Sequence, residues 1–72
     1  MSLPDYQQRV VEEQRELGKR IESLHAFIDY SSEFNLLSVS EQSRLKLQFT
    51  IMEAYSLILA SRIRAFTEGD KE

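Results

Sequence analysis

Five side chains in this sequence are of types that together bind a phosphorylated ring compound: Tyr6, Arg9, Tyr55, Arg62 and Arg64. An arginine guanidinium presents a fork of N–H donors that fits a phosphate, and a tyrosine ring stacks on a base or a ribose face. Tyr55 and Arg62 are seven residues apart, so they share one face of a helix. We therefore expect these five residues to bind a ligand, with the arginines holding phosphate and the tyrosines stacking on the base.

A second group of similar chemistry comprises Arg44, Lys46, His25 and Tyr30. It lies near the loop end of the helical hairpin predicted below, whereas Tyr6, Arg9, Arg62 and Arg64 lie near its open end. Both groups also fit a plainer role, because exposed arginines confer solubility and aromatic or arginine side chains often anchor interfaces that hold no ligand. Ligand binding and simple interface packing therefore both remain open for these residues.

Catalytic and metal-binding patterns are absent from the sequence. It contains no cysteine and one histidine, His25, and it has no G-x-S-x-G, H-E-x-x-H or phosphate-cradling glycine motif. Neighbouring carboxylates such as Glu12 and Glu13 lie on a solvated helix face, where nothing would separate their pKa values for acid–base work. We expect no enzyme activity, no catalytic residue, no metal site and no cofactor.

Composition narrows the class of protein and its partners. The net charge is −3, but residues 42–67 hold four basic side chains against one acidic, a sum of +3. An acidic chain is poorly suited to DNA or RNA, whereas a local basic excess suits a small anion. The longest apolar run, residues 54–60, is far short of the roughly 20 residues that span a bilayer. We expect a soluble, cytosolic protein with no secretory signal and no membrane partner.

The first 30 residues have the pattern of one long helix, predicted over residues 3–30 with Ser2 as its cap. A heptad seam runs along it, comprising Gln7, Val10, Gln14, Leu17, Ile21, Leu24 and Ile28. On its outer face we expect ion pairs at i,i+4 between Arg9 and Glu13 and between Glu16 and Arg20. Gly18 interrupts this helix, and either a close approach by another helix or simple tolerance explains it.

Residues 31–38 form the predicted connection. Ser32 is expected to cap a single helical turn, and Phe34, Leu36 and Leu37 should cover the loop end of the hairpin. Ser38 and Glu41 form a capping box that starts a second helix, predicted over residues 39–67. Gly69 and the charged tail of residues 68–72 should end that helix.

The second helix is apolar on two faces. One stripe comprises Leu45, Phe49, Met52, Leu59, Ile63 and Phe66, and the other comprises Leu47, Ile51, Ala54, Ile58 and Ala65. The two stripes are offset by two residues, which is roughly 200° around a helix, so they lie nearly back to back. Only one of them can face the first helix, and the other requires a further partner.

These patterns predict an all-α fold with a single domain over residues 1–72. Two long helices of matched length form an antiparallel hairpin in which Leu17 faces Met52 and Val10 faces Leu59. A chain of this size buries only about 60% of its unfolded surface and has no disulfide to compensate. We therefore expect copies of the chain to cover the second stripe, giving a homo-oligomeric helical bundle, a dimer or higher.

The pattern from about Tyr6 to Phe66 resembles the crAss-phage-related hairpin family, which are small helical proteins of tailed bacteriophages. The positions that carry the resemblance are Tyr6, Arg9, Val10, Leu17, Ile21, Leu24, Phe27, Ile28, Phe34, Leu37, Glu41, Gln42, Leu45, Gln48, Met52, Tyr55, Leu59, Arg62 and Ile63. The resemblance implies an accessory protein of a phage. In size and expected assembly the chain is also similar to phage sponges that sequester nucleotide immune signals.

Two functions follow as expectations. The first is a phage anti-defence protein in the host cytosol that binds and withholds a nucleotide-derived immune second messenger at oligomer interfaces. A cyclic nucleotide or an ADP-ribose-type compound would be its ligand. The alternative is a helical protein–protein interaction module, a phage adaptor or an inhibitor of a host protein, that binds no small molecule.

Overall fold

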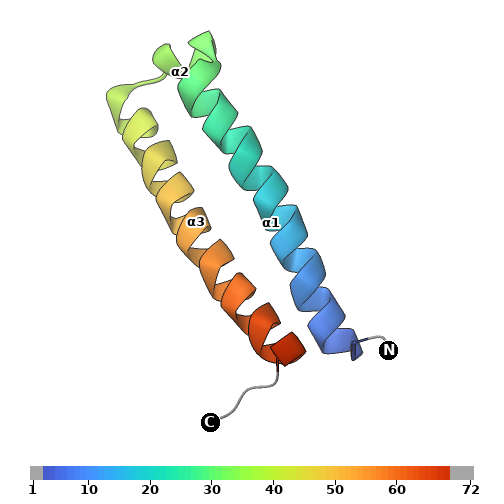
Figure 1. Cartoon of the computed structure of the whole chain (residues 1–72). Helices are drawn as coiled ribbons and strands as arrows, with labels where there is room; N and C mark the ends of the chain where they lie inside the picture. Colours follow the sequence, from blue (N-terminus) through green and yellow to red (C-terminus); the bar gives the residue numbers. More distant parts are fainter. Residues whose placement is uncertain (1–2, 69–72) are drawn as a thin grey trace.

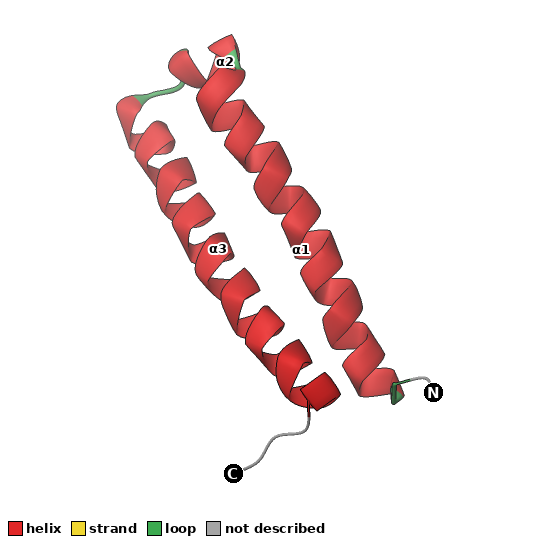
Figure 2. Cartoon of the chain, viewed as in Figure 1, coloured by secondary structure: helices red, strands yellow, loops and turns green. Residues whose placement is uncertain are grey.

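The computed structural model describes residues 3–68 as two long antiparallel helices that lie side by side (Figure 1). The elements are α1 (Asp5–Tyr30), the short α2 (Ser32–Asn35) and α3 (Val39–Glu68). Figure 2 shows helix throughout this part of the chain except before α1 and at the short connections. The predicted all-helical hairpin is confirmed, including a helical turn in the connection. No helix among the described residues has the length and apolar character to cross a membrane.

The start of α1 differs from the prediction. The helix begins at Asp5, two residues later than expected, because Pro4 has an extended backbone with φ −56° and ψ 157°. The carbonyl oxygen of Pro4 accepts hydrogen bonds from the amides of Gln7 and Gln8, both at 3.0 Å. Asp5 in the first turn has a charge that suits the positive end of the helix dipole. The predicted cap, Ser2, lies outside the described residues.

The cap of α2 is Ser31, so the prediction of Ser32 was wrong by one residue. Ser31 is extended and ends α1, and its Oγ accepts a hydrogen bond from the amide of Glu33 at 3.2 Å. Its carbonyl oxygen accepts a second bond, from the amide of Phe34. One extended serine therefore closes one helix and starts the next.

The start of α3 uses the predicted serine cap and an additional side chain. Ser38 Oγ accepts from the amide of Glu41 at 3.1 Å, while the Glu41 carboxylate binds Arg44 at 2.9 Å. Gln42 Nε2 donates to the carbonyl oxygens of Phe34 and Leu37 at 3.1 and 3.0 Å. This amide ties the connection to the first turn of α3. The end of α3 at Glu68 is one residue beyond the prediction, and Gly69 lies outside the described residues.

The interface between α1 and α3 follows the two predicted seams. The seam positions are Gln7, Val10, Gln14, Leu17, Ile21, Leu24 and Ile28 on α1, and Leu45, Phe49, Met52, Leu59, Ile63 and Phe66 on α3; all are buried or half-buried. Val10, Leu17 and Leu59 form the buried centre, with Met52 packed against them. Gln14 Nε2 donates to the carbonyl oxygen of Ser56 at 3.4 Å in the same register. The predicted register of the hairpin is confirmed.

Aromatic contacts close both ends of the hairpin. Tyr6 packs edge-on against Phe66 at the open end, with ring centroids 6.0 Å apart. At the loop end Phe34 is buried and packs edge-on against Phe27 at 5.9 Å. Leu36, expected to cover this end as well, is 84% exposed, because the turn after α2 directs it away from the helices.

The second apolar stripe of α3 is exposed. Leu47, Ile51 and Ile58 are 60%, 58% and 59% exposed, and Ala54 between them is also exposed. Ala65, the fifth predicted member, is half-buried. We call Leu47, Ile51, Ala54 and Ile58 the outer stripe. As predicted, α1 covers one apolar face of α3 and leaves the other uncovered.

Gly18 has open space around it. A Cβ atom added at this position would have no neighbour within 4 Å apart from the adjacent residues and the backbone of its own helix. Within the described chain, therefore, no helix approaches closely enough to require glycine here.

Substitution of the most deeply buried side chain should destabilise the hairpin. Leu59 is 0% exposed, so Leu59→Ala should lower the free energy of unfolding by about 2–5 kcal/mol through lost burial and a residual cavity. Leu36→Ala removes the same atoms from an 84% exposed site and should cost less than about 0.5 kcal/mol. Urea unfolding followed by far-UV circular dichroism measures both. Equal losses in the two variants would contradict the core described here.

Substitution of the open glycine should stabilise α1. Gly18→Ala should raise the free energy of unfolding by about 0.5–1 kcal/mol, because alanine restricts the unfolded chain and meets no clash. The reverse change at an exposed site of the same helix, Ala26→Gly, should lower it by a similar amount. The same urea titrations measure both effects. A loss of stability in Gly18→Ala would show that a helix does pack against this position.

Candidate functional site

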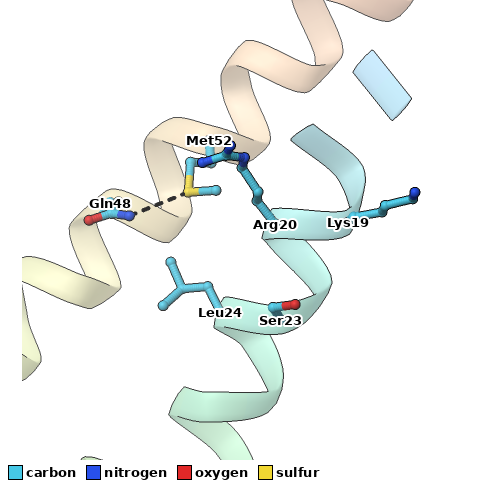
Figure 3. Close-up of a pocket in the computed structure, with 6 residues that line it drawn as sticks. All are labelled: Lys19, Arg20, Ser23, Leu24, Gln48 and Met52. Atoms are coloured by element: carbon cyan, nitrogen blue, oxygen red, sulfur yellow. Dashed lines mark hydrogen bonds between the residues drawn. The ribbon is translucent and has the colours of Figure 1, made fainter. Parts of the chain in front are cut away.

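A basic groove runs between α1 and α3 about halfway along the hairpin. It has a volume of about 400 Å³ and is lined by Lys19, Arg20, Ser23, Leu24, Gln48 and Met52 (Figure 3). We call this set the basic groove. Its wall includes two cations, a hydroxyl and an amide, and it includes no carboxylate.

The helix periodicity explains why these side chains meet. Leu24 and Met52 are seam residues, so they are half-buried and form an apolar floor. The polar members flank the seam and therefore stand around that floor. Gln48 Nε2 lies 3.8 Å from the sulfur of Met52, one turn further along α3. In Figure 3 the guanidinium of Arg20 extends across the floor toward Met52, whereas Lys19 points away from α3.

Arg20 lacks the carboxylate partner that was predicted for it. Glu16 pairs with Lys19 at i,i+3, with Nζ and Oε2 3.8 Å apart, and not with Arg20 at i,i+4. The expected pair of Arg9 and Glu13 is likewise not formed. Within residues 3–68 the structure shows no ion pair for Arg20. Its donors are therefore free to bind an anion.

Tyr55 adjoins the basic groove. Together with Glu13, Glu16, Leu17 and Arg20 it lines a hollow of about 270 Å³. Its hydroxyl donates a hydrogen bond to the carboxylate of Glu13 on α1, and its side chain remains 44% exposed. Arg20 lines both this hollow and the basic groove, so the two are neighbours.

Two predicted ligand-binding residues lie at the open end, away from the basic groove and this hollow. Tyr6 is 59% exposed and rests on Phe66. Arg9 lines a separate hollow with Asp5, Gln8 and Glu12, where two carboxylates offset its charge. The chain therefore places Arg9 in surroundings less favourable to phosphate than those of Arg20.

The remaining two predicted residues, Arg62 and Arg64, are both exposed on α3. They are two residues apart, which is about 200° around a helix, so they project to nearly opposite sides. Arg62 shares the face of Tyr55, at a distance of seven residues or about 10 Å along the axis. A small ligand on one chain can therefore contact one of these arginines but not both. Of the five predicted residues, Tyr55 is the one that lines a hollow next to the basic groove, with Arg20 as the shared residue.

The second predicted cluster, near the loop end, is only partly brought together: His25 and Tyr30 pack edge-on with ring centroids 6.4 Å apart, while Arg44 and Lys46 have other neighbours. His25 stacks on Phe49, with ring centroids 5.6 Å apart, and its Nε2 lies 2.7 Å from the Asp29 carboxylate. Lys46 Nζ lies 5.9 Å from the ring centroid of Phe34. Since Arg44 binds Glu41, each cation of this cluster has its own neighbour.

The members of the basic groove were not among the predicted ligand-binding residues. Lys19 and Arg20 were interpreted as part of a solvated helix face, and Met52 as a core residue. A usable signal was present, because Arg20 and Ser23 flank the seam at positions that face Gln48 in the predicted register. When the two helices are placed in this register, the polar residues beside the seam on both helices indicate where the groove lies.

The opposite side of the interface has different chemistry. A depression of about 480 Å³ is lined there by Gly18, Ile21, Glu22, Glu53, Ser56 and Leu57. Its two carboxylates disfavour a phosphate. In the described part of the chain no group of three or more histidine, aspartate or glutamate side chains is placed to hold a metal ion.

Fold and site together define a small all-helical hairpin with a basic groove between its long helices. The chain matches the sequence model of the Sequestin family over residues 4–65. It belongs to the Sequestin family, whose name is consistent with the sequestration of another molecule. No curated protein and no solved structure matches the chain.

Proposed function

We propose that this protein is a phage anti-defence protein that binds and sequesters a nucleotide-derived immune second messenger in the host cytosol. The observation that carries the proposal is the basic groove, where Arg20 forms no ion pair within residues 3–68 and no carboxylate lines the wall; Glu13 and Glu16 line only the adjoining hollow. Membership in the Sequestin family supports withholding of a bound molecule as the activity. The resemblance to phage hairpin proteins supports a phage-encoded protein that acts in the host cell. Such a protein acts by binding alone and does not convert its ligand.

The groove offers complementary groups for each part of a nucleotide. The guanidinium of Arg20 and the hydroxyl of Ser23 suit phosphate oxygens, since a guanidinium binds them in a fork. Lys19 adds a second positive charge at the rim. The apolar floor of Leu24 and Met52 suits a base or ribose face.

Tyr55 adds an aromatic ring in the neighbouring hollow, which shares Arg20 with the basic groove. Its ring is held by the hydrogen bond to Glu13 and is 44% exposed, so it can stack on a base. Gln48 can donate to and accept from a base edge. A cyclic nucleotide or an ADP-ribose-type compound contains both a phosphate and a purine ring, which is the combination that the groove accommodates.

A second function is favoured by a different observation. The outer stripe of α3 leaves Leu47, Ile51 and Ile58 exposed, and a helix with such a stripe can bind another protein. Under this alternative the chain is a helical interaction module for a host or phage protein, with no small-molecule ligand. Capture of a stoichiometric protein partner together with indifference to nucleotides would favour it.

Calorimetric titration with cyclic dinucleotides and ADP-ribose derivatives tests the first function. At least one of these compounds should bind at micromolar concentration or below. Arg20→Ala should weaken that binding by about 10–100-fold, the loss expected for one charge-assisted hydrogen-bonding group.

Two control variants sharpen this titration. Arg15→Ala removes the same group from the outer face of α1, where Arg15 binds Glu12, and should leave the affinity within about twofold. Arg62→Ala reports on the residue first predicted to hold phosphate. The absence of heat with every compound well above micromolar concentration would refute the proposal. Equal affinities of Arg20→Ala and the unmodified protein would show that the ligand does not bind in the basic groove.

A further inference from the structure

The outer stripe of α3 has a spacing that reads the same in both directions. Leu47, Ile51, Ala54 and Ile58 are separated by steps of four, three and four residues. All four are exposed, on the side of α3 away from α1. A stripe with this symmetry matches a second copy of itself when the two helices run antiparallel.

We propose that two copies of the chain pair through α3 in this antiparallel register. Leu47 then packs against the partner's Ile58, and Ile51 packs against the partner's Ala54. Each large side chain of the central layers faces a small one, so the two helices can approach closely at the middle of the stripe. The contact is isologous, because every pair occurs twice.

The residues beside the stripe favour the antiparallel direction. Along one edge Glu41, Gln48, Tyr55 and Arg62 follow each other every seven residues, and all but the half-buried Glu41 are exposed in the single chain. Antiparallel pairing places Glu41 next to the partner's Arg62. Parallel pairing would instead place this edge against the partner's other edge, where Ser43, Thr50 and Leu57 offer Arg62 no opposite charge. Charge complementarity thus identifies the occupant of the outer stripe as a second copy in this orientation.

The same pairing brings a partner residue to the basic groove. Gln48 lines that groove, and the antiparallel register places the partner's Tyr55 beside Gln48. The edge that contains Gln48 and Tyr55 meets the same edge of the partner along one side of the dimer interface. Since each groove adjoins this edge, both grooves open on the same face of the dimer. Each groove then has two tyrosine rings near it, its own Tyr55 and the partner's Tyr55. Only this last step rests on the proposed function, since the dimer itself needs no ligand.

Cysteine cross-linking tests the pairing, because the chain contains no cysteine of its own. Leu47→Cys and Ile58→Cys are prepared as two separate variants and oxidised alone or mixed. Antiparallel pairing predicts a disulfide-linked dimer only in the mixture, since identical positions lie eleven residues or about 16 Å apart along the axis. Cross-linking of either variant alone would indicate parallel pairing and overturn the proposal.

Sedimentation equilibrium supplies an independent readout on the unmodified chain. The expected mass at about 100 µM is twice the 8.4 kDa of one chain, and a mass of 8.4 kDa would overturn the proposal. Ile51→Glu should be a folded monomer by circular dichroism, because residue 51 makes no core contact within the chain. Leu36→Glu introduces the same charge at an exposed site off the stripe and should remain dimeric.

Calorimetry on the same variants separates this inference from the proposed function. If the dimer forms and no nucleotide binds, the proposed function fails and the pairing stands. If monomeric Ile51→Glu binds a nucleotide as tightly as the unmodified dimer, the groove needs no partner and the contribution of the partner's Tyr55 is refuted. A loss of affinity of about tenfold or more in Ile51→Glu, with its helix content unchanged, is the result expected of a shared site.

Discussion

The structure depends on an imbalance between its two long helices. α1 has one apolar seam and a charged remainder, whereas α3 is apolar on two faces. A hairpin can bury one face of each helix, so packing against α1 covers Val10, Leu17 and Leu59 but leaves Leu47, Ile51 and Ile58 in water. Apolar area that remains exposed in this way is a driving force for association. The hairpin therefore forms both helices completely but leaves part of the apolar surface of α3 exposed.

The same interface positions the basic groove. Where two helices pack, the seam residues form a floor and the flanking residues form walls, so any polar residues beside the seam face each other across an apolar strip. In this chain the walls differ in charge. At the basic groove one side presents Lys19 and Arg20, whereas the depression opposite presents Glu22 and Glu53, so an anion is favoured at the groove and disfavoured opposite it. Because Glu16 pairs with Lys19, it forms no ion pair with the guanidinium of Arg20.

The features that repeat with the helix period could be predicted from the sequence. The seams, the register of Val10 with Leu59, and the uncovered stripe all follow from residue spacing, because burial of apolar area dominates a small helical fold. The features that depend on competition between near-equal local options could not. Ser31 and Ser32 are both good caps, and Glu16 can reach either Lys19 or Arg20, so differences well below 1 kcal/mol decide the outcome. The basic groove was missed for a different reason, because Lys19 and Arg20 were interpreted as solvated charges without considering which residues of the second helix face them.

The hydrogen bonds of Gln42 have a consequence for how the hairpin opens. This side chain joins the connection to α3 across only eight residues, from Phe34 to Gln42, whereas Tyr6 and Phe66 close the far end across sixty. The entropic cost of closing a loop rises by about 0.6 kcal/mol for each doubling of its length, so the contact between Tyr6 and Phe66 costs about 2 kcal/mol more to close than the hydrogen bond of Gln42. Thermal fraying therefore begins at the termini and proceeds toward the connection, and amide hydrogens should exchange with solvent in that order.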